Sequence, residues 1–261
     1  MGGRSTLVLS PRFSDDSNVL WRAALDLGID VERARGMRLS SIPSNAFLYG
    51  EPLFADAVAE PLGISLLQPT PEWLPSLSRQ YLGRWVELTS TGDLFDRREA
   101  WSPLFVKPPD DKLFAARVYD HLADLAAVTH DLPGDTAVLV SSPVRFEVEY
   151  RAFVAARKVL ALSVYVRDGA VAEGWVEQPG EREGALGLLN ALLADEAVSL
   201  PPALVIDVGR LDSGEWVVVE GNPAWASGLC GCDPAAVLQV LAAAAVPRGT
   251  GGTWARQAKN A

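Results

Sequence analysis

Cysteine, histidine and methionine are scarce in this sequence, which contains two residues of each. The cysteines, Cys230 and Cys232, are too few for a structural zinc site and too close together for an easy disulfide bond. We expect both to be reduced thiols that pack in the core. The histidines, His121 and His130, belong to no nucleophile motif, which disfavours hydrolases that use a histidine base or a histidine-bound metal.

Long hydrophobic runs and an excess of basic residues are also missing. The apolar run at residues 6–9 is shorter than the core of a signal peptide, and no run approaches the length of about 20 residues that a membrane span needs. The sequence therefore predicts a cytoplasmic protein with no membrane partner. A formal net charge of −10 disfavours nucleic acid, although a cleft in an acidic protein can still bind a small anion such as ATP together with Mg²⁺.

The composition is that of a globular protein of mixed α/β (α+β) class. The 261 residues are enough for one compact enzyme built from two or three subdomains, and 49% hydrophobic with 21% charged residues excludes disorder and coiled coils. Strand and helix patterns alternate over the first 70 residues and predict a small Rossmann-like unit, with strands at 6–9, 46–49 and 63–67 and helices at 18–27 and 54–60. Its first loop, residues 10–17, lacks a G-x-G-x-x-G dinucleotide fingerprint.

The remaining chain is predicted to form two α+β subdomains. We place the N-terminal unit and an aromatic connector at 1–86, a smaller lobe at 87–137, a larger lobe at 138–247 and a flexible tail at 248–261. The larger lobe has a β-rich block followed by helices, with strands expected at 148–155, 159–166, 204–208 and 216–220 and helices at 181–193 and 234–245.

The first candidate site is a strand that ends in Lys107 and runs into a short loop with a second lysine, Lys112. A phosphate group fits such a place, and a solvated lysine at a strand end is the alternative. The second candidate lies on one face of the strand at 148–155 and its approach, where alternation places Glu147, Glu149 and Arg151 together. A cross-strand ladder of ion pairs explains these charges without a ligand.

The third candidate combines Asp207 with Glu220 and Asn222, which occupy matching places in two apolar strands. Unpaired carboxylates buried there would cost several kcal/mol, roughly, so they need a cation or a hydrogen-bond donor. Two carboxylates and an amide oxygen suit Mg²⁺, and hydrogen-bonded structural acids are the alternative.

The order of these segments resembles the ATP-grasp superfamily, and most closely its clade with two arginines and one lysine. The resemblance covers most of the chain. Its motifs are Leu48-Tyr49-Gly50, Tyr81-Leu82-Gly83-Arg84, Phe105-Val106-Lys107-Pro108, Asp111-Lys112-Leu113-Phe114, Glu149-Tyr150-Arg151-Ala152-Phe153, Val205-Ile206-Asp207-Val208-Gly209 and Val219-Glu220-Gly221-Asn222-Pro223-Ala224-Trp225.

The resemblance implies an ATP-grasp fold with a Rossmann-like N-terminal unit and two subdomains that grip ATP. It also implies roles: Lys107 at the α- and β-phosphates, Arg151 at the transferred phosphate, Asp207, Glu220 and Asn222 around Mg²⁺, and a hinge at 138–143, with Val140 and Ser141, against which adenine lies. Lys112 is a further candidate for nucleotide binding, and Glu149 is either a ribose contact or an orienter of Arg151.

The implied activity is an ATP- and Mg²⁺-dependent carboxylate–amine ligase that works through an acyl phosphate, with a small-molecule or peptide carboxylate and an amine as substrates. Two alternatives share the cleft: an ATP-binding regulatory module without ligase activity, and a kinase. The sequence departs from the superfamily pattern in two ways. No long glycine-rich phosphate loop follows Lys107, and the second arginine of the clade is either Arg84 or Arg167.

Overall fold

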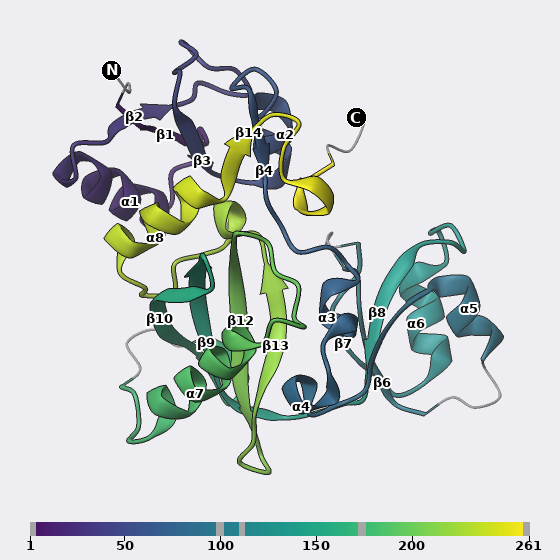
Figure 1. Ribbon diagram of the computed structural model, residues 1–261. Helices are drawn as coiled ribbons and strands as arrows, with labels where there is room; N and C mark the ends of the chain where they lie inside the picture. Colours follow the sequence, from purple (N-terminus) through teal and green to yellow (C-terminus); the bar gives the residue numbers. More distant parts are fainter. Residues whose placement is uncertain (1–3, 98–101, 110–112, 172–175, 258–261) are drawn as a thin grey trace.

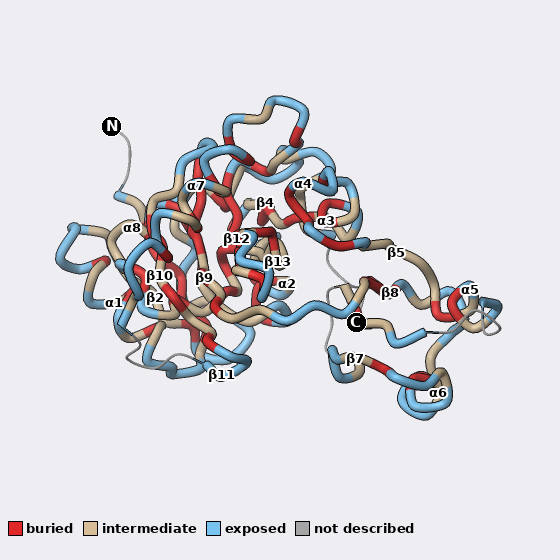
Figure 2. Tube along the Cα trace, turned by 90° about the horizontal axis from the view of Figure 1, so that it is seen from below, coloured by how far each residue is buried: buried red, intermediate tan, exposed pale blue. Residues whose placement is uncertain are grey.

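The computed structural model describes residues 4–97, 102–109, 113–171 and 176–257. Figure 1 shows an N-terminal unit stacked on a large sheet, with a smaller lobe beside that sheet. Figure 2 shows that buried segments concentrate in the large sheet and its neighbours, whereas the smaller lobe projects to one side. The cleft between the two lobes is where the candidate residues meet.

The N-terminal unit is a three-stranded parallel sheet in the order β2-β1-β3. Its elements are β1 (Thr6–Leu9), α1 (Asp15–Asp26), β2 (Asp30–Arg33), β3 (Ala46–Tyr49), α2 (Pro52–Val58) and β4 (Ile64–Leu66). Helix α1 begins earlier than expected because Ser14 and Ser17 cap it reciprocally: each backbone N–H donates to the other's hydroxyl, at 3.1 and 3.2 Å. The half-exposed strand β2 had no apolar pattern to predict it.

The larger lobe is an antiparallel sheet in the order β11-β10-β9-β12-β13. Its strands are β9 (Phe146–Ala155), β10 (Lys158–Arg167), β11 (Ala170–Val171), β12 (Ala203–Leu211) and β13 (Trp216–Asn222). One face packs on α7 (Glu181–Ala194) and the connector helices α3 (Trp73–Ser76) and α4 (Arg79–Leu82). The other face packs on α8 (Pro234–Ala243), which lies between this sheet and the N-terminal unit (Figure 1).

The aromatic connector forms two short helices, because Leu77 and Ser78 between them have extended backbone conformations, and the left-handed Gly83 ends the second helix. Gly83 also allows close approach to β13, since a Cβ there would lie 2.6 Å from the Val217 side chain. The connector therefore holds the start of the smaller lobe against the strand that carries Glu220.

The smaller lobe is a four-stranded sheet in the order β5-β8-β6-β7 with its own core. Its elements are β5 (Val86–Ser90), α5 (Thr91–Asp96), β6 (Leu104–Lys107), β7 (Arg117–Tyr119), α6 (Leu122–Thr129) and β8 (Ala137–Ser141). Because β8 pairs with β5 and β6, residues 138–141 belong to this sheet rather than to the larger lobe, where the sequence had placed them.

The segment from residue 245 folds back onto the N-terminal unit. Strand β14 (Ala245–Pro247) pairs with β4, and the short helix η3 (Gly252–Trp254) follows it. Arg248 forms an ion pair with Glu60, and Arg256 forms one with Asp56. The expectation of a flexible tail from residue 248 is therefore wrong for residues 248–257, which distant contacts fix in place, and residues 258–261 lie outside the described part of the chain.

Candidate functional site

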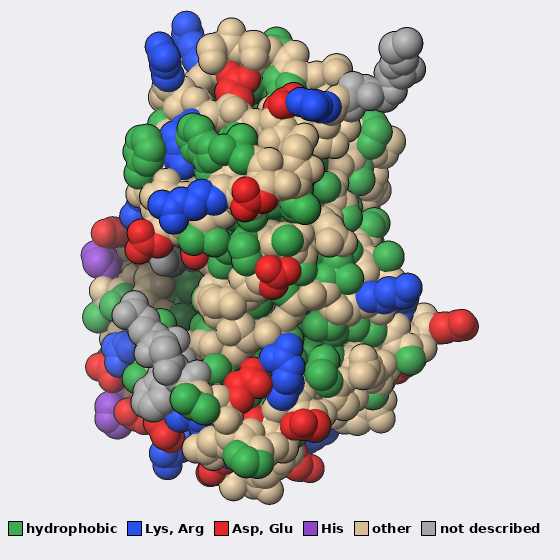
Figure 3. All heavy atoms as spheres, turned by 90° about the vertical axis from the view of Figure 1, so that its left-hand side faces the viewer, with side chains coloured by type: hydrophobic (Ala, Val, Ile, Leu, Met, Phe, Trp, Pro, Cys, Tyr) green, Lys and Arg blue, Asp and Glu red, His purple; other side chains and the backbone are tan. Residues whose placement is uncertain are grey.

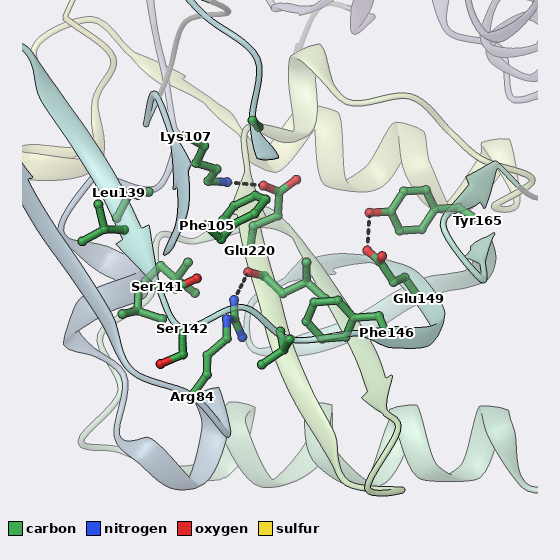
Figure 4. A pocket seen from close by; sticks show the side chains of 16 residues that line it. Arg84, Phe105, Lys107, Leu139, Ser141, Ser142, Phe146, Glu149, Tyr165 and Glu220 are labelled. Atoms are coloured by element: carbon green, nitrogen blue, oxygen red, sulfur yellow. Dashed lines mark hydrogen bonds and ion pairs between the residues drawn. The ribbon is translucent and has the colours of Figure 1, made fainter. Parts of the chain in front are cut away.

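The two lobes enclose a cavity of about 290 Å³, which we call the cleft cavity (Figure 4). The smaller lobe contributes Phe105, Lys107 and residues 139–142 at the end of β8 and just after it, and the larger lobe contributes Phe146, Glu149 and Glu220. This volume lies at the low end of about 300–1,000 Å³, the usual range for small-ligand pockets. The cavity is apolar at β8 and charged at Lys107 and Glu220.

The charged end is organised by strand register. Asp207 on β12 lies directly opposite Arg151 on β9 and Glu220 on β13, so the three side chains form a row on one face of the sheet. The row ends at the smaller lobe, because Lys107 on β6 forms an ion pair with Glu220. Lys107 occupies the end of its strand because Pro108 and Pro109 follow, and proline cannot extend the hydrogen-bonded ladder.

Arg151 and Asp207 form a bidentate ion pair within the sheet. The guanidinium donates from Nε to Oδ1 at 2.9 Å and from Nη2 to Oδ2 at 2.7 Å, and Asp207 is fully buried. Burial raises the pKa of Asp207 against the opposing effect of Arg151. The hydrogen bonds to Asp207 overcome desolvation and raise the pKa of Arg151, which therefore stays charged.

Asn222 ties the two carboxylates together. Its Nδ2 donates to Asp207 Oδ2 at 3.0 Å and to Glu220 Oε1 at 2.9 Å. Burial opposes ionisation of Glu220, but Lys107 and this amide together hold its pKa below the usual value. The three residues therefore converge on one point between the sheet and Lys107.

This donor set fits a divalent cation. Among the residues that the structure describes, no three His, Cys, Asp or Glu side chains gather into a metal centre, but two carboxylates and an amide converge here. Ligation through all three requires the Asn222 side chain to turn so that its amide oxygen, and not Nδ2, faces the cation. It also requires Lys107 or Arg151 to give up carboxylate oxygens.

Glu149 and Tyr165 form the far wall of the cleft cavity (Figure 4). The phenol donates to Glu149 at 3.0 Å and lies 3.5 Å from Asp207. Burial raises the pKa of Glu149 to about 6, and burial with the neighbouring carboxylates raises the pKa of Tyr165, which remains a neutral donor. Arg151 stacks over the Tyr165 ring at 4.7 Å.

The two candidates for the second clade arginine lie in different surroundings, and both are buried rather than solvated. Arg84 lines the cleft cavity and donates to the main-chain carbonyls of residues 82, 218 and 219 at 2.8–3.0 Å. Burial lowers its pKa to about 10. Arg167 lies on the other side of the sheet in a bidentate pair with Glu181, at 2.7 and 2.8 Å. Of the two, Arg84 is the one that borders the cavity.

Most of the sequence-predicted site residues come together here. Lys107, Val140, Ser141, Glu149 and Glu220 line the cleft cavity, whereas Arg151, Asp207 and Asn222 connect to it through the hydrogen bonds above. Lys112 lies outside the described residues.

Sequence reasoning missed Tyr165 and Phe146, which read as core residues of apolar strands. The structure also contains the cross-strand ion pairs that the sequence left open as an alternative to a ligand site. Arg151 pairs with Asp207 and Glu147 pairs with Arg210, so cross-strand ion pairs are present alongside the cavity.

Solved structures of ATP-grasp proteins are similar to this fold. A RimK domain ATP-grasp protein from Sphaerobacter thermophilus matches with a TM-score of 0.54 and 16% identity, over 92% of this chain and 96% of its own. The D-alanine–D-alanine ligase of Bacillus anthracis gives 0.57 and 13%, over 93% and 97%. Carboxyaminoimidazole ribonucleotide synthase of Aspergillus clavatus, complexed with ATP, gives 0.59 and 12%, over 97% and 80%. At such identities these likenesses establish the fold alone.

The family is established by a second comparison. A model of the ATP-grasp domain, for the second family of the clade with two arginines and one lysine, matches residues 81–240, which is more than half of the chain. The protein belongs to this family, and the predicted fold and clade are thereby confirmed. A comparison with curated proteins finds no match.

Proposed function

We propose that the protein is an ATP- and Mg²⁺-dependent ligase that activates a carboxylate as an acyl phosphate and joins it to an amine. The observation that carries the proposal is the charged row at the mouth of the cleft cavity. Arg151, Asp207 and Glu220 lie at one register on three adjacent strands, and Lys107 from the opposite lobe closes the row. Phosphoryl transfer depends mainly on positioning and charge neutralisation, which such a row supplies.

The cavity divides into two functional ends. Adenine is proposed to lie against Val140 and Ser141 on β8, where Phe105, Phe146 and Leu139 provide apolar walls. Glu149 is placed for the ribose, and its role as an orienter of Arg151 is less favoured because its hydrogen bond comes from Tyr165. The phosphates would then extend toward Lys107, with Arg84 contributing a second positive charge to the wall.

Asp207, Glu220 and Asn222 are the residues that would hold Mg²⁺, which neutralises phosphate charge when bound. Arg151 aligns Asp207 through two hydrogen bonds at the buried end of the row. Lys107 holds Glu220 in the same way at the exposed end and is within reach of phosphate oxygens from the cavity.

The proposed substrates are small-molecule or peptide carboxylates and amines. Acidic and basic side chains are interspersed on the face in Figure 3, and the formal net charge is −10, which together argue against nucleic acid. None of the described helices combines the length and apolarity needed to cross a bilayer. A cytoplasmic location remains part of the proposal.

Product analysis tests this function. The protein is incubated with ATP, Mg²⁺ and mixtures of amino acids, and ADP, phosphate and new amides are measured. A ligase yields ADP, phosphate and amide in equal amounts. ATP binding without turnover would instead identify a regulatory module, and phosphate left on the acceptor would identify a kinase.

A further inference from the structure

A second, smaller cavity of about 100 Å³ adjoins the cleft cavity, and we call it the recess. Both linings include Lys107, Glu220, Leu74 and Leu139, so these four side chains form the partition between the two spaces. Asn222 faces the recess and not the cleft cavity. The charged end of the proposed ATP site therefore borders a separate space behind it.

The chemistry of phosphoryl transfer gives this space a role. The attacking and leaving oxygens lie roughly in line through the transferred phosphorus. With the base on β8 and the phosphates directed at Lys107 and Glu220, the leaving oxygen lies on the side of the cleft cavity. The attacking oxygen must then approach from the recess.

The walls of the recess define what fits. Their apolar part consists of prolines 52, 69, 71, 109 and 223 together with Trp73 and Trp225, and their charged part consists of Lys107, Glu220 and Arg256. Its volume is about a third of that of the cleft cavity, so it suits a carboxylate on a short stem rather than a second nucleotide. Trp73 closes one side tightly, since a Cβ at Gly221 would lie 2.5 Å from its ring.

The remaining wall comes from residues 245–257, which fold back onto the N-terminal unit and which we call the fold-back segment. Arg256 lines the recess, donates to Asp56 at 2.7 and 2.9 Å and to Gln68 at 3.1 Å, and lies over the Trp225 ring at 5.4 Å. Pro52, residues 68–74 and Arg256 all lie outside the family match at 81–240. Half of the recess lining thus comes from parts of the chain that the family match does not cover.

We propose that the recess is the acceptor subsite and that it takes a small carboxylic acid with a short apolar stem. The proposal rests on the proposed ligase function. A carboxylate oxygen forms a bond to the γ-phosphorus of ATP, and the bond from that phosphorus to the β–γ bridging oxygen breaks, with its electron pair leaving on ADP. No proton is transferred in this step, and the product is an acyl phosphate.

Trapping with hydroxylamine tests the proposal. The nitrogen of hydroxylamine attacks the acyl carbon, the bond from that carbon to the phosphate oxygen breaks, and the phosphate takes up the proton that nitrogen loses, so each acyl phosphate yields one hydroxamate. The protein is incubated with ATP, Mg²⁺, hydroxylamine and acetate, propionate, butyrate or phenylacetate in turn. We expect the short aliphatic acids to give at least tenfold more hydroxamate than phenylacetate.

Thr70, half-buried in the recess wall, provides the variants. Thr70→Phe fills the recess and should lower hydroxamate formation at least tenfold, whereas Thr70→Ala enlarges it and should raise the phenylacetate-to-propionate ratio. The matched control is Thr250→Phe, on the fold-back segment but exposed and outside the recess, which should leave all rates within twofold. Melting temperature and ATP binding report whether each variant is folded.

The outcomes separate the two proposals. Hydroxamate that forms equally in Thr70→Phe and the unmodified protein would overturn the recess while leaving the ligase function standing. A folded Thr70→Ala with an unchanged acid preference would overturn it as well if Thr70→Phe does not fold. ATP binding with no hydroxamate from any of the four acids would overturn the recess as a site for short acids, and the amide-product assay described above would then decide the ligase function separately.

Discussion

Two cation–carboxylate pairs lie at the same end of the cleft, and they differ in how they are built. Arg151 and Asp207 face each other on adjacent strands of one sheet, with two hydrogen bonds and side chains 12% and 0% exposed. Lys107 and Glu220 come from different lobes and are 18% and 28% exposed. The first pair is part of the sheet, whereas the second joins two bodies.

Because of this difference, we expect the first pair to stabilise the sheet and the second pair to respond to ligands. A buried pair cannot lose one partner without stranding a charge, so Arg151 and Asp207 act as one unit that keeps the row rigid. A pair between lobes can separate when a ligand offers its members better partners, because water already reaches both groups. The inter-lobe pair is therefore the one that we expect ATP and Mg²⁺ to open.

The sharpest comparison comes from removing each partner. Arg151→Met or Asp207→Leu should each lower the free energy of unfolding by about 3–5 kcal/mol, because each leaves a buried charge unpaired. The double variant should recover most of the loss. Lys107→Met and Glu220→Gln should each cost less than about 1 kcal/mol. Urea unfolding measures all five variants, and simple additivity of the two buried-pair substitutions would show that the charges are not coupled.

The function of the inter-lobe pair is tested by ATP affinity. Lys107→Ala should weaken ATP binding about 10- to 100-fold, the equivalent of about 1.5–3 kcal/mol for a hydrogen bond to a charged group. Lys158→Ala is the matched control, since this lysine lies exposed at the turn between β9 and β10. Calorimetric titration measures both, and equal affinities would make Lys107 an ordinary strand-end lysine.

Glu149, which lies near both pairs, should make the free energy of unfolding depend on pH. Its folded-state pKa of about 6 exceeds the ordinary value of 4.5, so ionisation disfavours the folded state. The stabilisation is complete below pH 4.5 and is lost as pH rises through about 6, a change of about 2 kcal/mol. Glu149→Gln should therefore gain about 2 kcal/mol relative to the unmodified protein between about pH 4.5 and 7.5. Guanidinium unfolding without nucleotide tests this, and an unchanged difference at the two pH values would contradict it.

The smallest expected effect concerns the metal. ATP with Mg²⁺ should raise the melting temperature at least about 3 °C more than ATP with EDTA, which corresponds to roughly a tenfold difference in affinity. Glu220→Gln should abolish this difference, because it weakens one ligand at the exposed end of the row. Equal shifts with and without metal in the unmodified protein would remove the Mg²⁺ assignment.

Sequence pattern was sufficient for the large sheet and its charged residues. Alternating apolar residues predict β9, β10, β12 and β13, and the acids in β12 and β13 stand out because charge is costly in such strands. The register of the strands could not be predicted, because no local sequence pattern indicates that Arg151 lies opposite Asp207 or that Asp207 lies opposite Glu220. The same charges were therefore open to interpretation as a site or as a ladder.

The fold-back segment could not have been predicted from local pattern. Its polar, glycine-rich composition is typical of loops, and nothing nearby explains its order. Arg256 is held by Asp56, 200 residues earlier in the chain. Strands β2 and β5 were missed for a related reason: their half-exposed residues show no apolar alternation, and pairing with neighbours makes them strands.

The position of the fold-back segment in the sequence determines when the recess can form during synthesis. The ribosome releases the N-terminal unit first, then the two lobes, and Arg256 only after all of them. A nascent chain that ends before residue 256 can form the cleft cavity but lacks one wall of the recess. The recess is thus complete only after both lobes have emerged, so the proposed acceptor subsite forms later in synthesis than the cleft cavity.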